Sequence, residues 1–281
     1  MSSVLKRVVY IGNMHQVAEY IHHADNLQLA AIVCESGKLT DELYTLAVIR
    51  DVPLLQISNV AELHGLCTEH CFDYAVMCSF GKRITPGILE LIDIYNIHYA
   101  ALPEYKGRHP TFYAVMNDEE SIGISMHKVT LEIDQGQIIA QESIPNYFWD
   151  TEEDIFRKLT TMIPALLFSL EQYLAGYLGA ADNKGGSYQE PVHDGMTAIN
   201  LENDSLKDIY NKVRAQYRYG GSRLELGTGV AIRVKRLLFT DPAENEFKGS
   251  WIYDREAGIV YVRKDAVLLK INMFEVIQGL S

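Results

Sequence analysis

The sequence contains little cysteine and no long uninterrupted apolar run. Its 281 residues include four cysteines, too few to build a disulfide framework in a chain of this length. The longest apolar stretch runs from Met162 to Leu178, and it contains Pro164, Glu171 and Gln172. Its length and polarity predict a buried helix and not a membrane span.

Two N-terminal signals are also missing. No charged and apolar leader opens the sequence, because the first apolar run, Val8 to Ile11, is short and leads directly into Gly12. Gly12 and Asn13 form a strand-to-helix turn, but the other glycines of a dinucleotide-binding G-x-G-x-x-G motif are absent. We therefore expect a soluble, cytoplasmic protein that does not use NAD.

Basic residues are outnumbered, at 25 against 37 acidic residues, which gives a net charge of −12. From Asp182 onward there are 14 of each kind, so the first 181 residues carry the whole excess of negative charge. A protein that grips tRNA usually presents a broad basic surface. This charge distribution disfavours nucleic acid as a partner and favours a small molecule with one or two phosphates.

Two groups of residues have both a structural and a functional interpretation. His64, Cys67, His70 and Cys71 are close enough to suggest a metal site, but they lack the paired spacing of zinc ligands. We interpret them as small buried cysteines and surface histidines on a short helix, and expect no metal. A second group is interpreted as solvated surface, although it could contact RNA, a nucleotide or a partner subunit: Arg214, Arg218, Arg223, Arg233, Lys235 and Arg236.

The hydrophobic pattern predicts an α/β fold. Short apolar runs alternate with helix-length segments, as in a Rossmann-like parallel sheet with helices on both faces. The predicted strands are Val8 to Ile11, Leu29 to Cys34, Tyr74 to Cys78 and Ile94 to Ile97. Further along, we predict a helix over Thr111 to Asn117 that Pro110 opens, and strands over Ile122 to His127 and Gln137 to Gln141.

A change of pattern in the last third of the chain predicts a second, smaller domain. A long helix begins near Asp150, with acids in its first turn, and is expected to run to about Tyr177. We predict a catalytic domain over 1–181, a linker over 182–204 and a small β-barrel-like domain over 205–281. The last begins with a helix, Leu206 to Ala215, and continues with four strand-like runs: Ala231 to Phe239, Ser250 to Asp254, Ile259 to Arg263 and Ala266 to Met273.

Three polar residues near the middle of the chain form a candidate catalytic set. Asn96 and His98 end a predicted strand, where ligands bind in open parallel sheets, and Asp134 opens a turn. An amide can stabilise a carbonyl oxygen that gains negative charge, an imidazole can relay a proton, and a carboxylate can set the tautomer and pKa of that imidazole. The structural alternative is that Asn96 and Asp134 form turns and His98 is a hydrogen-bonded structural residue.

The segment from Tyr95 to Ile144 resembles the formyltransferases that use N10-formyltetrahydrofolate as donor. The resemblance rests on five pieces in order, which together are more specific than a single motif: Asn-x-His, Leu-Pro-x-Tyr-Lys-Gly, an Asn near a helix end, Gly-Ile-Ser-x-His and Asp-x-Gly-x-Ile. It departs from the commonest wording at Tyr99-Ala100-Ala101 and at Gln135. Neither departure removes a member of the candidate set, so both bear on the acceptor and not on the reaction.

This resemblance implies specific roles. Asn96, His98 and Asp134 would be catalytic, and N10-formyltetrahydrofolate would be the co-substrate, with no metal. Residues implied for the folate are Phe80, Gly81, Lys82, Leu102, Pro103, Val129 and Ile133. Residues implied for the phosphates of the acceptor are Lys106, Gly107 and Arg108, although this loop could equally be ordinary solvated surface.

Several acceptors and one non-enzymatic function remain open. The wording Lys-Gly-Arg-His-Pro and the acidic catalytic part favour the N-formyltransferases of nucleotide-linked amino sugars, which serve surface polysaccharide synthesis. Alternatives are methionyl-tRNA formyltransferase, formylation of another small amine such as a siderophore hydroxyornithine, hydrolysis of the donor, or a binding module without catalysis. We expect a homodimer through the strand-rich tail and no membrane contact.

Overall fold

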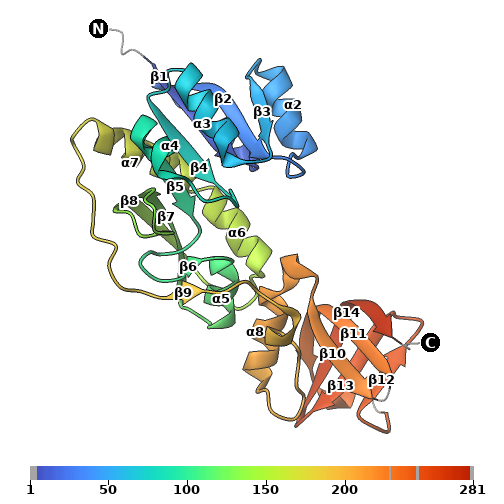
Figure 1. The fold of residues 1–281 in the computed structure, drawn as a ribbon. Coiled ribbons are helices and arrows are strands. Elements are labelled where there is room, and N and C mark those ends of the chain that lie inside the picture. The colour runs from blue at the N-terminus through green and yellow to red at the C-terminus, as the bar shows by residue number, and fades with distance from the viewer. Residues whose placement is uncertain (1–4, 228, 245–246, 279–281) are drawn as a thin grey trace. The chain divides into compact units, whose positions relative to one another are not determined.

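The computed structural model describes residues 5–227, 229–244 and 247–278, and Figure 1 traces the order of their elements. The chain forms two compact units. The first unit contains the described residues up to Gly107, with Gly123–Ile144 and Lys158–Tyr188. The second unit contains Arg108–Ile122, Pro145–Arg157 and the described residues from Gln189 onward. The units interleave along the chain, and the domain boundaries expected after residues 181 and 204 stay a prediction.

A seven-stranded sheet forms the centre of the first unit, in the order β3-β2-β1-β4-β5-β7-β8. Its strands are β1 (Lys6–Gly12), β2 (Leu27–Glu35), β3 (Leu54–Ile57), β4 (Tyr74–Cys78), β5 (Ile94–His98), β7 (Ser121–Lys128) and β8 (Ile138–Pro145). The first five strands pair in parallel, whereas β7 runs antiparallel to β5. The predicted Rossmann-like sheet is confirmed, with an antiparallel extension at the β5 side.

Helices cover both faces of this sheet, because successive residues of a buried strand point to opposite faces. On one face, Val9 and Ile11 pack with Leu63 of α3 and Ile88 of α4. On the other face, the neighbouring residues Val8 and Tyr10 are equally buried, and α1 contacts both α2 and α7. The helices of the first unit are α1 (His15–His23), α2 (Asp41–Ile49), α3 (Val60–Glu69), α4 (Pro86–Leu91) and α7 (Ile163–Leu174).

The long helix predicted from near Asp150 to Tyr177 is wrong, since the structure has two helices, α6 (Glu152–Thr160) and α7. Pro164 lies in the first turn of α7, where its missing N–H needs no partner. In the interior of one continuous helix the same proline would remove a hydrogen bond and clash with the preceding turn. Among residues 5–227, 229–244 and 247–278, no helix has the length and apolar character to cross a bilayer.

The four cysteines are unpaired thiols. Cys34 and Cys78 are buried in the sheet, and Cys67 is half-buried on α3. Cys71 is exposed, against our expectation, because it follows the end of α3 at Glu69. Within the described part of the chain, no three side chains of the metal-binding types gather in a way that could hold an ion.

An antiparallel sheet forms the core of the second unit, as the tail pattern predicts. Its order is β10-β11-β14-β13-β12, with β10 (Ser222–Gly227), β11 (Val230–Thr240), β12 (Trp251–Asp254), β13 (Ile259–Lys264) and β14 (Val267–Gln278). Helix α8 has the predicted bounds, Leu206–Ala215, because Ser205 and Asp208 form a reciprocal capping box at its start. Ile209 and Val213 of α8 pack against the sheet. The unit also contains α5 (Pro110–Met116) and the short helix η2 (Tyr217–Tyr219).

Gly136 closes the base of the turn that carries Asp134, and we expect Gly136→Ala to destabilise the protein. A Cβ at this position would lie 1.6 Å from the Lys128 carbonyl oxygen, so the backbone must shift. Overpacking of this kind costs about 1–3 kcal/mol, measurable as the free energy of unfolding in urea. The control is Gly179→Ala, because nothing lies within 4 Å of a Cβ there. Equal stability of the two variants would contradict this assignment.

Candidate active site

Strand β5 places two of the predicted residues on one face of the sheet. Asn96 and His98 are two residues apart, so their side chains point the same way. Residue Asn96 is paired in register with His127 on the antiparallel strand β7, and the Asn96 Nδ2 lies 3.1 Å from the His127 Nε2. His98 is 7 % exposed at the carboxyl end of β5. The strand pairing therefore gathers one amide and two imidazoles.

The turn between β7 and β8 brings Asp134 to these side chains. Its carboxylate lies between the two imidazoles, with Oδ2 3.6 Å from the His98 Nδ1 and Oδ1 3.3 Å from the His127 Nε2. The Gly107 N–H also donates to Oδ2, at 2.9 Å. Asp134 has a φ of 52°, a left-handed conformation that Asp tolerates better than most residues. The three residues that the sequence singled out thus meet in one place within the first unit.

The surroundings of Asp134 keep its carboxyl ionised. Burial raises its pKa, but the contact with the His127 ring, the charges of the two imidazoles and the Gly107 N–H outweigh burial and bring the pKa to about 2. This pKa lies below the ordinary value of 3.8, so the folded state favours the carboxylate. The stability gained is present above the unfolded pKa and is lost as the pH falls toward 2.

Hydrogen bonds determine the tautomer of His98. Its Nε2 lies 2.9 Å from the Tyr105 carbonyl oxygen, which can only accept, so Nε2 carries the hydrogen. In the neutral ring, the Nδ1 that faces Asp134 is therefore free to take a proton. Burial lowers the pKa of His98 and a charged His127 lowers it further, while Asp134 and the Tyr105 carbonyl raise it. The net effect lowers the pKa of His98 from its ordinary value, which favours the neutral ring that can act as a base.

His127 and Asn183 complete the cluster and were missed as site residues. The His127 Nδ1 donates to the Lys128 carbonyl oxygen, so its Nε2 accepts from the Asn96 amide when the ring is neutral. Asn183 is 4 % exposed, and its Nδ2 donates to the carbonyl oxygens of Asp134 and Gly136, at 2.9 and 2.7 Å. The Gly-Ile-Ser-x-His piece was a signal for His127. No local pattern connects Asn183 to a turn 49 residues earlier.

Residues predicted for the folate lie in three loops of the first unit. Gly81 donates its N–H to the Glu35 carboxylate at 2.6 Å, and Lys82 lies 3.8 Å from the same group. Both follow β4, the neighbour of β5. The other predicted residues are half-buried or buried: Phe80, Leu102, Pro103, Val129 and Ile133.

Two of these loops meet opposite ends of β5. Leu102 and Pro103 follow the carboxyl end of the strand and are joined by a cis peptide bond. The Val129 N–H donates to the Ile94 carbonyl oxygen at 2.8 Å, so Val129 lies at the start of β5. The predicted residues therefore flank Asn96 on both sides along the strand.

The three residues predicted for the acceptor differ in their surroundings. Lys106, in the short strand β6 (Lys106–Gly107), is 4 % exposed, and its ammonium donates to the carbonyl oxygens of Asn183 and Gly185, at 3.1 and 2.9 Å. Gly107 uses its N–H on Asp134. Arg108 is exposed. Lys106 and Gly107 thus support the cluster from within the protein, and Arg108 presents its charge to solvent.

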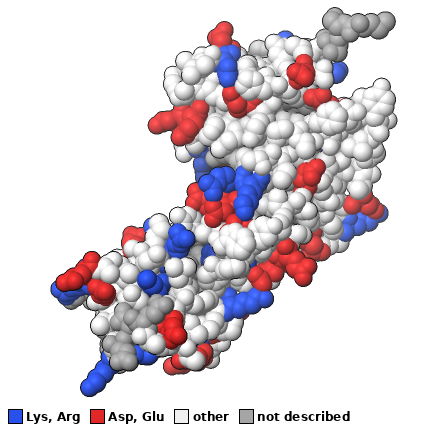
Figure 2. All heavy atoms as spheres, turned by 180° about the vertical axis from the view of Figure 1, so that it is seen from behind, with Lys and Arg blue, Asp and Glu red and all other residues white. Residues whose placement is uncertain are grey.

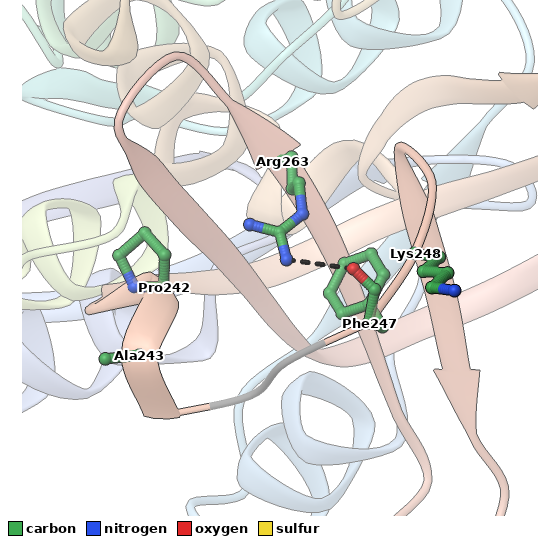
Figure 3. Close-up of a pocket in the computed structure, with 5 residues that line it drawn as sticks. All are labelled: Pro242, Ala243, Phe247, Lys248 and Arg263. Carbon is green, nitrogen blue, oxygen red and sulfur yellow. Dashed lines mark hydrogen bonds between the residues drawn. The ribbon is translucent and has the colours of Figure 1, made fainter.

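The charged surface and a pocket in the second unit offer less chemistry than this cluster. Figure 2 shows acidic and basic side chains interspersed over the face that it draws. Figure 3 shows a depression in the second unit, lined by Pro242, Ala243, Phe247, Lys248 and Arg263. Its arginine already donates to the Phe247 carbonyl oxygen at 3.0 Å and lies 4.6 Å over the Phe247 ring. The five lining residues include no acid–base pair, so the cluster around Asp134 is the candidate active site.

Comparison by sequence finds formyltransferases. Residues 55–169 match the family described as formyl transferase. The methionyl-tRNA formyltransferase of Thermotoga maritima is 24 % identical over 271 residues, which cover 88 % of this chain and 86 % of that protein. The methionyl-tRNA formyltransferase of Lactococcus lactis is 31 % identical over 178 residues, which cover 60 % of this chain and 56 % of that protein.

Comparison by structure finds the same fold at low identity. A sugar N-formyltransferase from Shewanella aligns with a TM-score of 0.68 at 15 % identity, over 82 % of this chain and 97 % of that one. An N-formyltransferase from Helicobacter canadensis, solved with folinic acid and dTDP-3-aminofucose, aligns with a TM-score of 0.66 at 17 % identity, over 95 % and 99 %. HypX from Aquifex aeolicus aligns with a TM-score of 0.70 at 15 % identity, over 98 % of this chain and 47 % of the HypX chain.

We expect Asp134→Asn to lower the pKa of His98 further. The carboxylate raises that pKa by stabilising the imidazolium, and an amide of the same shape removes the charge. The measurement is an NMR titration of the His98 ring protons in both proteins. The exposed Asp25 supplies the matched control, Asp25→Asn, which should leave the titration of His98 unchanged. A His98 pKa that stays the same or rises in Asp134→Asn would overturn the electrostatic coupling described above.

Proposed function

We propose that this protein, whose residues 55–169 match the formyl transferase family, transfers a formyl group from N10-formyltetrahydrofolate to the primary amine of a nucleotide-linked amino deoxy sugar. The observation that carries the proposal is the Asp134 carboxylate between His98 and His127, with the amide of Asn96 on the same face of the sheet. This set can move a proton and stabilise a developing oxyanion in one step, without a covalent bond to the enzyme.

Each member of the set has one task in this mechanism. The amine of the acceptor attacks the formyl carbon to form a tetrahedral intermediate with a negative oxygen, and the bond from that carbon to N10 then breaks. The His98 Nδ1 takes the proton that the amine loses and supplies one to N10. The Asp134 carboxylate stabilises the imidazolium in between, since its own pKa of about 2 keeps it charged.

The amide of Asn96 supplies the oxyanion donor. An amide nitrogen carries two hydrogens, and the hydrogen bond to the His127 Nε2 uses one of them. The second hydrogen is available to the formyl oxygen as it becomes negative. The bond to His127 also orients the amide, because it fixes which end of the side chain is the nitrogen. His127 is therefore proposed as a positioning residue for Asn96.

The folate is proposed to bind along β5 and its neighbouring loops. Phe80, Gly81 and Lys82 follow the adjacent strand β4, and Leu102 and Pro103 follow β5 itself. Val129 and Ile133 belong to the turn that carries Asp134. Their half-buried apolar side chains suit the flat ring of a pterin, and backbone groups of the loops can bond to its polar edge.

A sugar acceptor is supported by structure and a tRNA acceptor by sequence. The sugar N-formyltransferase from Shewanella shares the fold, and the excess of negative charge lies in the first 181 residues, where a tRNA would meet repulsion. The second candidate is methionyl-tRNA formyltransferase, because curated relatives such as that of Thermotoga maritima carry this name. We further propose that the enzyme works in the cytoplasm as a homodimer and serves surface polysaccharide synthesis.

Mass spectrometry can distinguish these acceptors. Purified protein and N10-formyltetrahydrofolate are incubated with a panel of dTDP-, UDP- and GDP-linked amino sugars, and in parallel with methionyl initiator tRNA and with hydroxyornithine. We expect one formyl group to be added to a member of the sugar panel and none to the other acceptors. Formyl transfer to the tRNA alone would replace the proposal by the second candidate. Formate release without an acceptor would indicate hydrolysis of the donor.

Substitutions in the set should reduce turnover without unfolding the protein. We expect His98→Ala to lower kcat about 10²–10⁴-fold, since it removes the proton relay. Asn96→Ala should lower kcat about 10²–10³-fold, since it removes the oxyanion donor. The control is His70→Ala, because His70 is exposed beyond the end of α3. Near-normal turnover in His98→Ala would refute the assigned role of this residue.

A further inference from the structure

Three basic side chains that the mechanism does not use lie together in the second unit. Arg108 and His109 precede α5, and Arg218 belongs to η2, more than one hundred residues later. The charges of Arg108 and Arg218 both lower the pKa of His109, as does its burial. The Tyr219 hydroxyl lies 3.2 Å from the His109 Nδ1, so Arg108 and Arg218, the chain neighbours of these two residues, come near one another. Among the residues that the structure describes, none forms an ion pair or hydrogen bond with the Arg108 guanidinium, and Arg108 is exposed.

The backbone at His109, just before α5, has a strained conformation. His109 has a φ of 56°, and the following residue is Pro110. A left-handed conformation costs energy for a residue with a side chain, and a residue before proline prefers extended geometry. Strain of this kind persists only where surrounding contacts enforce it, and it gathers at sites of function.

Tyr219 supplies the contacts that hold His109. The Tyr219 hydroxyl lies 3.2 Å from the His109 Nδ1, and the two rings meet edge to face with centroids 5.1 Å apart. The Tyr219 ring also packs edge to face against Phe112 of α5. The turn that begins α5 is thus fixed by a residue of η2, the short helix after α8, and Arg108 lies next to this turn.

Arg218 is held in place by groups beneath it and keeps part of its guanidinium in solvent. Its Nε lies 3.2 Å from the Glu152 Oε2, and the guanidinium carbon lies 3.9 Å over the Phe156 ring. The Arg218 side chain is 31 % exposed and that of Glu152 is fully buried. Thr111 donates a hydrogen bond to the other oxygen of Glu152. These contacts fix a long flexible side chain in one orientation, which reduces the entropy lost when a ligand binds.

The charges of the group are unbalanced at the surface. Two guanidinium groups stand against one carboxylate, that of Glu152, which is fully buried beneath them, and the neutral His109 ring adds a hydrogen-bonding group but no charge. Burial raises the pKa of Glu152, and nearby Glu153 acts in the same direction, against the lowering effects of Arg218 and Thr111. Arginines present planar pairs of donors that match phosphate oxygens. The exposed side of the group is therefore suited to an anion.

We propose that Arg108, His109 and Arg218 form a binding site for the diphosphate of a nucleoside diphosphate derivative, with Tyr219, Glu152 and Phe156 as positioning residues. The inference rests on the proposed function, because it gives the phosphates of the acceptor a place on this chain. It also assigns the region after α8 a direct part in selecting the acceptor. Lys106, whose ammonium is already bonded to two carbonyl oxygens, takes no part.

The test is equilibrium binding of UDP, dTDP and GDP to the full chain by isothermal titration calorimetry, with the corresponding nucleosides as probes without phosphate. We expect at least one diphosphate to bind and its nucleoside to bind much more weakly. Arg108→Gln and Arg218→Gln should each weaken the diphosphate about tenfold to a hundredfold, since each removes charged hydrogen bonds. The control is Arg255→Gln, an exposed arginine of the same unit in the turn between β12 and β13.

Each outcome separates this inference from the function on which it rests. Failure of the unaltered protein to bind any diphosphate overturns both the nucleotide-linked acceptor and this site. Binding that is equal in the unaltered protein and in both arginine variants overturns the site alone. Arg108→Gln changes an exposed side chain, so it remains informative even where Arg218→Gln, which uncovers Glu152, lowers the melting temperature. An effect of the variants on initiator tRNA binding alone would also overturn the inference.

Discussion

A single buried carboxylate organises the candidate active site. Asp134 lies between His98 and His127, and its low pKa makes it a fixed negative charge within an interior that disfavours charge. Such a charge is stable only where its lone pairs are bonded. The N–H of Gly107 meets this demand, and the side chain of Asn183 holds the backbone of the turn. The geometry of the candidate active site therefore depends on three loops, which contain Gly107, Asp134 and Asn183.

The sheet provides the precision that this ion requires. Asn96 and His127 lie opposite each other because β7 runs antiparallel to β5, and a shift of one residue in that register would turn His127 away. Rigid strands thus position the amide and both imidazoles, while loops bring the carboxylate. The second unit contributes a different arrangement, in which Arg218 is held by the Phe156 ring and the buried Glu152. The candidate active site and the proposed diphosphate site therefore depend on different kinds of contact.

The sequence allowed prediction of those features that depend on neighbouring residues, such as strand ends and single helices. The end of a short apolar run placed Asn96 and His98 together at a strand end, and the pattern over Leu206 to Ala215 predicted α8 with its observed bounds. It did not predict the break between α6 and α7, because the apolar run hid the effect of Pro164. It also missed Asn183, whose two hydrogen bonds depend on how distant loops meet. Hydrogen bonds between residues so far apart produce no periodic or motif-like pattern in the sequence, so they cannot be predicted from it.

The hydrogen bonds of Asn183 bear on how this enzyme could be divided or recombined. A shortened chain that ended at Ala181 would keep Asn96, His98 and Asp134, and so every residue that a motif search recognises. It would lose the amide that fastens the Asp134 turn and the carbonyl groups that bind the Lys106 ammonium. Exchanging the parts of the chain before and after residue 181 between relatives would therefore separate Asn96, His98 and Asp134 from the contacts that hold the Asp134 turn and Lys106 in place. The segment after residue 181 is therefore a physical part of the candidate active site.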